Sequence, residues 1–326
     1  MKKLLLLCSF ILLMGGSLPA LAACTTAPVS AAFGGVSSFT VNTTASTVSA
    51  PGTINCGTGV LALLSSDSVT VQLVSATSST GNRGTLRLSD TIPVQLCTDS
   101  ACATELGIGG TLVTYSRSQL LGVSIGTGNR VVFNLPFFLR TVPGAVVAAG
   151  TYTVTLNVQV VYNVCTGIGI GGLCLLGSQN SGTTTLPLTA TIAIANDCTT
   201  ITSPAVNFGS APLVSSFTGV SQSINVICTK GSTYSVGMNN GIHAVGAQRY
   251  MASGTNLLAY EIYKGSGTAS RWGGTVTAER MQSTAANSVS PDGLTRTFNY
   301  NAQVLTSQAT PVAGSYSDTI TVDLSF

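Results

Sequence analysis

Short runs in which apolar and polar residues alternate recur along the whole chain, and each is bounded by Gly, Asn, Ser or Pro. They include residues 69–74, 92–96, 152–158, 223–227 and 319–326. Alternation with a period of two places the apolar residues of a strand on one face, as for Ile320, Val322, Leu324 and Phe326. Apolar residues at helical spacing are almost missing. The pattern therefore predicts an all-β fold built from antiparallel sandwiches.

A cysteine-anchored pattern occurs twice. In each copy a Cys-Thr-Thr triplet is followed by Phe-Gly and a second cysteine, and the copy closes on a Gly-Thr-Tyr or Gly-Ser-Tyr strand. The first copy has Cys24, Phe33, Cys56 and Tyr152, and the second has Cys198, Phe208, Cys228 and Tyr316. Two copies of one module predict two sandwich domains, at residues 23–196 and 197–326, each large enough for its own core.

Residues 185–196 join the two copies, and their apolar residues alternate with small or polar ones. The stretch is either the last ordinary strand of the first domain or a strand that occupies an open groove in that domain. Both interpretations place it against the first domain, and periodicity does not distinguish them.

The N-terminus has the features of an export signal over residues 1–22. Lys2 and Lys3 precede an apolar run and a small-residue site at Ala20-Leu21-Ala22. The run is too short to cross a bilayer comfortably. Because residues 21–24 also fit a lipoprotein processing box, lipidation of Cys24 stays open. We expect a chain exported through the periplasm.

Nine cysteines are present, and removal of the signal takes Cys8 and leaves eight. An even number in an exported chain predicts disulfides in an oxidising compartment. The repeat selects two pairs, and two local pairs follow by exclusion. The predicted bridges are Cys24–Cys56, Cys198–Cys228, Cys97–Cys102 and Cys165–Cys174.

Charged residues make up only 7% of the chain, and loss of Lys2 and Lys3 lowers the formal net charge from +3 to +1. That charge is too small for a grip on nucleic acid. A single histidine, His243, gives a Ser–His–Asp or Cys–His arrangement little to build on, and no cysteines have metal-ligand spacing. We expect no enzyme activity, no cofactor and no metal.

The second copy carries a dense set of motifs: Asn207-Phe208-Gly209, residues 228–231, Tyr234, Gly241, residues 249–251 and 258–260, Trp272-Gly273, and residues 311–322. With Cys198, these motifs resemble the spore coat protein U-like domain found in subunits of archaic chaperone–usher pili. The first copy matches only at its ends and at Arg83. The two-domain layout is similar to the tip adhesins of such pili, including the Csu type.

The resemblance implies an immunoglobulin-like fold for both domains, incomplete in the second and completed there by a strand from a neighbouring subunit. Ile320, Val322, Leu324 and Phe326 would border the groove, since no strand follows them to cover the edge. The implied partners are a periplasmic pilus chaperone, an outer-membrane usher and the adjacent pilin. After cleavage at Ala22, no strand precedes Cys24 that could be donated onward, so we expect a position at the pilus tip, on the cell surface.

Three apolar segments rich in Gly or Pro, at residues 106–113, 135–148 and 166–177, distinguish the first copy. In the resembling adhesins, hydrophobic finger loops attach cells to abiotic surfaces. The corresponding surface-binding residues would be Ile108, Leu112, Phe137, Phe138, Val146, Val147, Ile168, Ile170, Leu173, Leu175 and Leu176. Exposed apolar loops are unusual in soluble proteins, and folding back into the sandwich core is the alternative.

The leading hypothesis is a tip adhesin that mediates attachment to an abiotic or host surface and biofilm formation. A minor pilin or assembly initiator without an adhesive role is the alternative with the same fold. An exported carbohydrate-binding module is the alternative of another class, and it would require clustered aromatic residues.

Overall fold

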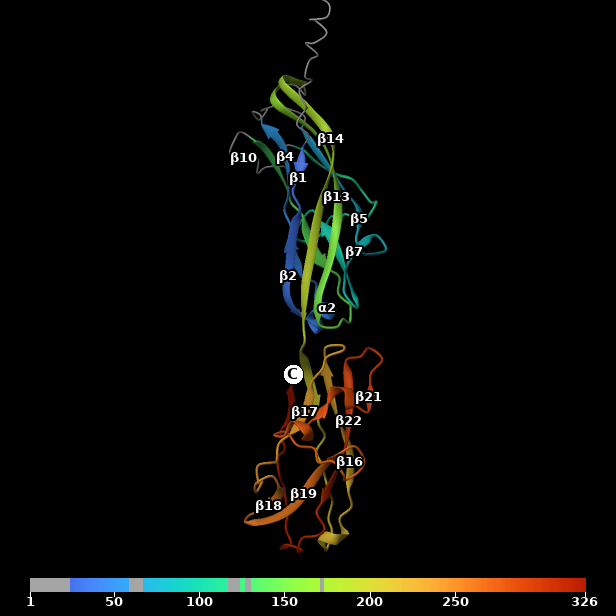
Figure 1. Cartoon of the computed structure of the whole chain (residues 1–326), viewed down its shortest axis with the longest axis vertical. Helices are drawn as coiled ribbons and strands as arrows, with labels where there is room; N and C mark the ends of the chain where they lie inside the picture. Colours follow the sequence, from blue (N-terminus) through green and yellow to red (C-terminus); the bar gives the residue numbers. More distant parts are fainter. Residues whose placement is uncertain (1–23, 59–66, 117–123, 127–129, 171–172) are drawn as a thin grey trace, which may run out of the picture.

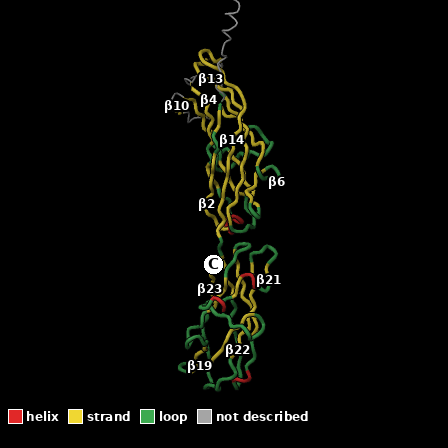
Figure 2. The backbone as a smooth tube through the Cα atoms, in the orientation of Figure 1, coloured by secondary structure: helices red, strands yellow, loops and turns green. Residues whose placement is uncertain are grey.

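The computed structural model describes residues 24–58, 67–116, 124–126, 130–170 and 173–326, so the predicted signal segment 1–22 lies outside the described residues. Figure 1 shows two sandwich-like domains stacked end to end, and Figure 2 shows that strands and loops make up nearly all of the chain. Among the described residues, no helix has the length and apolar character needed to cross a membrane.

The larger sheet of the first domain contains ten strands. They are β2 (Val29–Ser37), β3 (Thr47–Ser49), β5 (Ser68–Ala76), β6 (Ser79–Thr80), β7 (Arg83–Arg87), β8 (Thr91–Cys97), β9 (Val113–Ser116), β12 (Phe138–Thr141), β13 (Gly150–Ile170) and β14 (Leu173–Ala195). Their order is β2-β14-β13-β7-β8-β12-β3, while β5 pairs with β13 and β9, and β6 pairs with β7.

A second, four-stranded sheet completes this domain, in the order β1-β4-β11-β10. Its strands are β1 (Thr25–Thr26), β4 (Gly52–Thr58), β10 (Ser124–Gly126) and β11 (Arg130–Leu135), and a short helix, α2 (Ser38–Thr43), follows β2. The core lies between the sheets, because alternate residues of each strand point inward. In β5, Val69, Val71 and Leu73 are buried while Thr70 and Gln72 are not.

The hairpin of β13 and β14 is the longest feature of the molecule, paired from Gly150 and Ile194 to Ile170 and Leu173. The Gly-rich stretch 166–177, expected to be an apolar loop, instead continues both strands except at residues 171–172, which lie outside the described residues. The glycines that alternate with Ile168 and Ile170 each have a backbone N–H and a carbonyl, so they can take part in the hydrogen-bond ladder between the two strands.

Residues 185–196, left open by the sequence, form the lower half of β14 and the linker. This half of β14 lies between β13 and β2, antiparallel to β13 and parallel to β2. Its inward side chains, Leu186, Leu188, Ala190 and Ile192, are buried. β14 is thus the second strand of a hairpin, and at the same time it closes the sheet between two strands that would otherwise lie apart.

The second domain has a six-stranded and a three-stranded sheet. The strands of the larger sheet are β15 (Cys198–Thr202), β16 (Val220–Cys228), β18 (Arg249–Ser253), β19 (Asn256–Lys264), β21 (Ser288–Val289) and β22 (Thr295–Val304). The order is β15-β16-β22-β19-β18, with β21 on β22. The smaller sheet runs β20-β17-β23, formed by β17 (Ser235–Met238), β20 (Met281–Gln282) and β23 (Val322–Ser325).

Three short 3-10 turns, η1 (Val214–Ser216), η2 (Thr277–Glu279) and η3 (Ser283–Ala285), connect strands of the second domain. The aromatic residues Trp272, Phe298 and Tyr300 fill the centre of its core, with the rings of Trp272 and Tyr300 edge to face at 6.0 Å. The indole N–H of Trp272 donates to the carbonyl of Val236 at 2.9 Å, which satisfies its polar atom inside the core.

Four disulfides link the strands: Cys24–Cys56, Cys97–Cys102, Cys165–Cys174 and Cys198–Cys228. The first and last join the opening strand of each domain to the strand that pairs with it, so they occupy equivalent places in the repeat. Cys165–Cys174 ties the two strands of the long hairpin near its tip. These are the four pairs that the sequence predicts.

Candidate functional site

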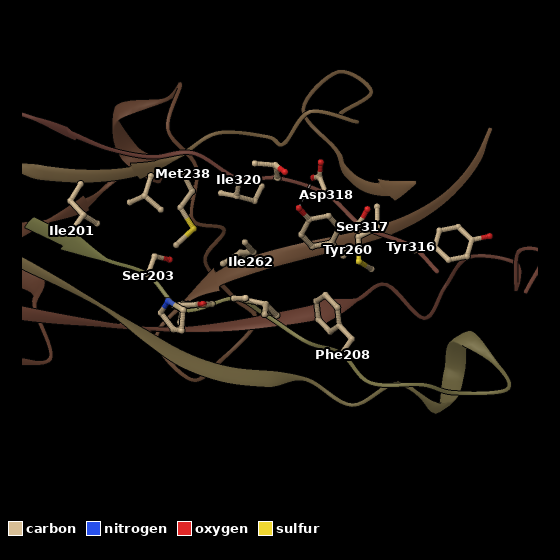
Figure 3. Close-up of a pocket in the computed structure, with 18 residues that line it drawn as sticks. Ile201, Ser203, Phe208, Met238, Tyr260, Ile262, Tyr316, Ser317, Asp318 and Ile320 are labelled. Atoms are coloured by element: carbon tan, nitrogen blue, oxygen red, sulfur yellow. Dashed lines mark hydrogen bonds between the residues drawn. The ribbon is translucent and has the colours of Figure 1, made fainter. Parts of the chain in front are cut away.

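A groove of about 630 Å³, lined mostly by apolar side chains, runs along the second domain. One wall is the stretch from Ile201 to Phe208, most of which follows β15 without joining a sheet, and the other is the stretch from Tyr316 to Val322 that leads into β23. Figure 3 shows side chains from both walls pointing toward the space between them. The floor consists of core side chains, namely Met238, Met251, Tyr260, Ile262, Tyr300 and Ala302.

The repeat shows what the groove corresponds to in the first domain. A tyrosine hydroxyl donates to the carbonyl four residues earlier in both copies, Tyr152 to Ala148 at 3.0 Å and Tyr316 to Val312 at 2.6 Å. The stretch from Tyr316 therefore matches β13, and the stretch around Phe208 matches β2. In the first domain β14 lies between those two strands. The groove is the place where the second domain has no counterpart of β14 among the described residues.

Polar side chains hold the Tyr316–Val322 wall in position. Asp318 accepts from the hydroxyl of Tyr260 at 2.7 Å and from the backbone N–H groups of Ile242 and His243 at 3.0 and 3.3 Å. Burial, together with the hydrogen bond to Asp318, raises the pKa of Tyr260 well above its ordinary value, so the hydroxyl remains a donor. The side-chain oxygen of Asn239 accepts from the N–H of Thr321 at 2.9 Å.

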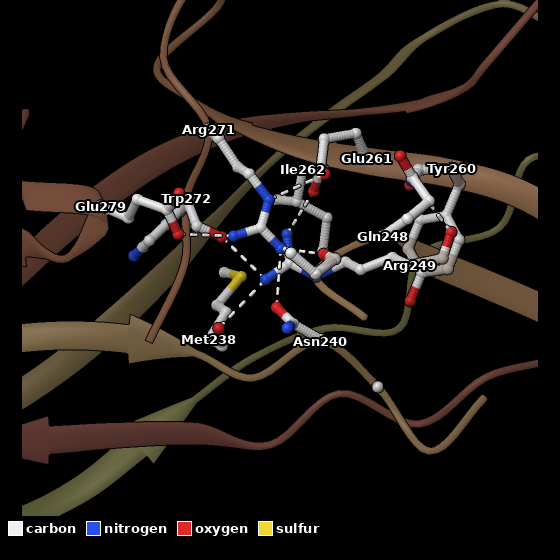
Figure 4. A network of polar contacts seen from close by, with 12 residues as sticks. Met238, Asn240, Gln248, Arg249, Tyr260, Glu261, Ile262, Arg271, Trp272 and Glu279 are labelled. Atoms are coloured by element: carbon white, nitrogen blue, oxygen red, sulfur yellow. Dashed lines mark hydrogen bonds and ion pairs between the residues drawn. The ribbon is translucent and has the colours of Figure 1, made fainter. Parts of the chain in front are cut away.

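A buried ion network lies behind the groove (Figure 4). The guanidinium of Arg249 has no solvent exposure; it pairs with Glu261 and donates to the carbonyls of Met238, Asn239 and Trp272. Arg271 bridges Glu261 and Glu279. Burial lowers the pKa of Arg249, and the charge of Glu261 opposes that shift. The network fixes the backbone of Met238, which lines the groove floor, and of Asn239, which holds the wall.

The predicted groove residues separate into two groups. Ile320 and Val322 line the groove. Leu324 is half-buried and packs against the core from β23, which pairs with β17. Phe326 is 66% exposed, with its ring 6.3 Å from that of Tyr234, and it is not part of the groove lining.

The predicted surface segments do not gather at one end of the first domain. Phe137 and Val147 are fully buried, so the expectation that these two residues bind a surface is wrong. The alternation of β11 continues past its end, so that Leu135 and Phe137 both enter the core while Pro136 between them is exposed. Val147 packs in the same core. Phe138 lies in β12, paired on both sides, and is half-buried. Val146 is half-buried in the loop that reaches the second domain.

The segment 106–113 lies along the side of the larger sheet. The N–H of Gly109 donates to the carbonyl of Leu73 in β5 at 2.8 Å, and Ile108 is half-buried against the core. Of the two predicted residues in this segment, only Leu112 is exposed, with an exposed fraction of 55%. This segment is therefore docked on β5 rather than free at a tip.

The hairpin tip is the predicted segment that lies farthest from the second domain (Figure 1). Ile168 pairs with Leu176, and Ile170 with Leu173. These four side chains and the side chain of Leu175 are outside the part of the molecule that the structure describes. The chain leaves β4 at Thr58 and returns at Asp67, whose side chain accepts from the N–H of Cys165 in the hairpin. Residues 59–66, whose sequence includes Val60, Leu61, Leu63 and Leu64, lie outside the described residues.

The described residues of the two domains contact each other at several points near the linker, and one of them is the hydrogen bond from the hydroxyl of Thr229 to the carbonyl of Ala195 at 3.3 Å. The hydroxyls of Ser38, in α2, and Thr229 lie 3.0 Å apart. Asp90, in the turn between β7 and β8, pairs with Lys230 and also accepts from the N–H of Ala148. Ala148 and Lys230 form an isolated parallel bridge. Thr229 further bonds to the linker residue Asp197, so the junction is fixed by polar contacts on both sides of a two-residue linker.

The model of the spore coat protein U domain matches residues 13–159 and 184–323, and the chain belongs to this family. The two matched stretches correspond to the two copies of the cysteine-anchored module. No curated protein matches the chain in sequence.

Among solved structures, the chain is similar to one from the CsuC–CsuE chaperone–tip adhesion subunit pre-assembly complex of archaic chaperone-usher Csu pili of Acinetobacter baumannii. The two are 23% identical with a TM-score of 0.53, over 93% of this chain and 100% of that one. This similarity extends to the whole two-domain fold. A tip adhesin from Pseudomonas aeruginosa and CfaE, the adhesive subunit of CFA/I fimbria of enterotoxigenic Escherichia coli, are each 11% identical, with TM-scores of 0.36 and 0.35. They cover 93% and 91% of this chain, and 94% and 92% of their own chains.

Proposed function

We propose that the protein is the tip adhesin subunit of an archaic chaperone–usher pilus, with a binding role and no catalysis. The second domain joins the fibre by accepting a donated strand, and the tip of the first domain attaches the cell to surfaces and promotes biofilm formation. The observation that carries the proposal is the apolar groove of the second domain, which occupies the position that β14 fills in the first.

The first domain indicates how the donated strand would lie. Like β14, it would run antiparallel to the Tyr316–Val322 wall and parallel to the Ser203–Phe208 wall. Its backbone would pair with the unpaired groups of both walls, and alternate apolar side chains would enter the groove. Residues of β14 show the pattern, with Leu186, Leu188 and Ile192 on the inward face.

The groove also indicates the assembly partners. An apolar groove bordered by strand edges is an aggregation hazard until it is covered. A periplasmic chaperone would cover it first, and the adjacent pilin would replace the chaperone at the outer-membrane usher. The protein would then be exported through the periplasm to the cell surface.

The surface-binding part of the proposal rests on the hairpin end. This end is farthest from the groove, and its sequence carries Ile168, Ile170, Leu173, Leu175 and Leu176. Apolar side chains at such an end would gain free energy from contact with an apolar material, roughly 25 cal/mol for each Å² removed from water. Trp272, the single tryptophan, is buried in the second domain and is not available to stack on a sugar.

One experiment tests both parts. Cells producing the pilus with Ile168→Ser, Ile170→Ser and Leu176→Ser in the full chain should assemble normal fibres and lose attachment to plastic. Val276→Ser with Val289→Ser, two residues 53% exposed on the second domain, is the matched control and should attach normally. Unchanged attachment by the hairpin variant would refute the adhesive role of the hairpin end and favour the alternative of a minor pilin or assembly initiator. Ile320→Asp, in the groove, should prevent incorporation of the chain into fibres; normal incorporation would refute the donated strand.

A further inference from the structure

The end of the first domain that faces the second is a docking surface made from three separate elements. They are α2, with Ser38; the turn between β7 and β8, with Asp90; and the loop before β13, with Ala148. All three contact the short loop that follows the second cysteine of the second domain, at Thr229 and Lys230. The surface thus receives the beginning of the next module along the chain.

The second domain repeats the same three elements at its far end. Val312 occupies the place of Ala148, because the two carbonyls accept the equivalent hydroxyls of Tyr316 and Tyr152. The turn η1 follows Phe208-Gly209 as α2 follows Phe33-Gly34, and both glycines have a positive φ, 75° and 80°. The turn between β18 and β19 corresponds to the turn that holds Asp90.

These counterparts have a different chemistry. Leu213, the residue before η1, is 54% exposed and Val312 is 67% exposed, whereas the first domain has Ser37, the residue before α2, and Ala148 at these places. The N–H of Val214 donates to the hydroxyl of Thr310 at 3.3 Å, which ties η1 to the loop before Val312. The turn between β18 and β19 contains Gly254 and Thr255 and no carboxylate. Figure 1 shows η1 and the loop that precedes Val312 at the end of the molecule opposite the hairpin.

The direction of the donated strand identifies what would cover this end. Only Asn196 and Asp197 separate β14 from β15, so the module that follows β14 lies directly against the end where β14 leaves the first domain. A strand that lay in the groove as β14 lies in its sheet would leave the second domain beside Leu213 and Val312. Its own module would then reach the exposed end.

We infer that Leu213 and Val312 form a docking surface for the body of the pilin that donates the strand. The contact is made with the loop that follows the second cysteine of that pilin, the counterpart of Thr229-Lys230. It is apolar, with no ion pair equivalent to Asp90–Lys230. The inference rests on the proposed donated strand, but it concerns a second contact that the strand alone does not require.

Photo-crosslinking in assembled fibres tests this contact. Benzoylphenylalanine is placed at Leu213 or Val312 of the full chain, which is produced in cells with its chaperone, usher and pilins. After irradiation, both positions should give a covalent adduct of this chain with one pilin, and peptide mapping should place the link in the loop after the second cysteine of that pilin. Val289, 53% exposed in β21, is the matched control and should give no such adduct.

Benzoylphenylalanine at Ser203, on the groove wall, reports the donated strand itself. An adduct from Ser203 with none from Leu213 or Val312 would overturn the docking surface and leave the donated strand intact. Loss of the Ser203 adduct as well would overturn the proposed function. As a second measurement, Leu213→Asp with Val312→Asp should keep the Ser203 adduct but lose retention of the chain on fibres in urea that leaves the native fibre intact. Unchanged retention would count against the contact.

Discussion

The two copies of the module carry an arginine at the start of equivalent strands, Arg83 in β7 and Arg249 in β18, and they should respond very differently to the same substitution. Arg83 pairs with Glu105 through two hydrogen bonds of 2.5 and 2.7 Å, but its side chain is 36% exposed. Arg249 is wholly buried. We predict that Arg249→Met destabilises the second domain strongly and that Arg83→Met barely affects the first.

The magnitude follows from what each substitution leaves behind. Without Arg249, Glu261 keeps only Arg271 as a cationic partner, at 2.9 Å, and the carbonyls of Met238 and Trp272 lose a buried donor. Removing one member of a buried ion pair costs about 3–5 kcal/mol. That is a large part of the roughly 5–15 kcal/mol that stabilises an ordinary domain. The Arg83–Glu105 pair is partly open to solvent, and ion pairs at a protein surface contribute about 0.2–1 kcal/mol.

The assay uses the single tryptophan of the chain. Trp272 lies in the second domain, and its carbonyl accepts from Arg249 at 2.8 Å. Its fluorescence in a urea titration of the full chain therefore reports unfolding of that domain. With a slope of about 2 kcal/mol per molar urea, Arg249→Met should lower the midpoint by about 2 M. Arg83→Met should leave the tryptophan transition unchanged and shift the far-UV circular dichroism transition of the first domain only slightly.

Similar small shifts for both variants would refute the reasoning, because burial would then not distinguish the two arginines. A second check is Arg249→Lys, which keeps the charge and loses the planar fork that reaches several carbonyls. It should lie between the native chain and Arg249→Met.

The remaining predictions concern the groove wall and the domain junction. Gly241 has a φ of +87°, and a Cβ there would lie 1.8 Å from Asp318 Oδ2. Gly241→Ala should therefore displace Asp318 and lower the thermal midpoint of the second domain. Gly246→Ala, at a φ of +61° with open space around it, is the control, and an equal loss of thermal midpoint in that variant would contradict the clash. Burial alone would raise the pKa of Asp90, but hydrogen bonds from Lys230 and Ala148 outweigh it and hold that pKa below its ordinary value. The contact between the domains should therefore be complete above about pH 4 and be lost as the pH falls through the lowered pKa. Small-angle X-ray scattering should show a wider spread of domain orientations in acid, and in Asp90→Asn the spread should not depend on pH.

The repeat made much of the architecture predictable. The period of two in the strands predicted an all-β fold, and the repeat predicted two domains. The matched cysteines predicted two of the bridges, and the other two followed by exclusion. These signals are local or are repeated in the sequence. Ile320 and Val322 belong to the alternating run 319–326, whose period of two places their side chains on one face, and both line the groove. The buried network of Arg249 gave no such signal, because its pairing with Glu261 depends on the register of β18 against β19.

The surface segments were less predictable, because local composition does not say to which end of a sandwich a loop belongs. Residues 135–148 are apolar like the hairpin tip, yet strand β13 begins at the end that faces the second domain, and Val147 packs into the core there. Gly-rich sequence similarly suggested turns at 166–177, where the ladder between β13 and β14 decides the structure. Strand direction and pairing are set by contacts between distant residues, and a single sequence does not contain them directly.

The continuity of β14 with the second domain determines how the molecule would bear a pulling force. A force applied between the hairpin tip and the second domain acts along the axis of β14, parallel to its ladders with β13 and β2. Because both points of attachment lie on β14 itself, its covalent backbone carries the load, and the hydrogen bonds to β13 and β2 are not pulled apart. A strand of 23 residues at roughly 3.3 Å per residue is already extended over about 75 Å, so it would lengthen little under load. The same hairpin that presents the tip thus makes the first domain a mechanical tether.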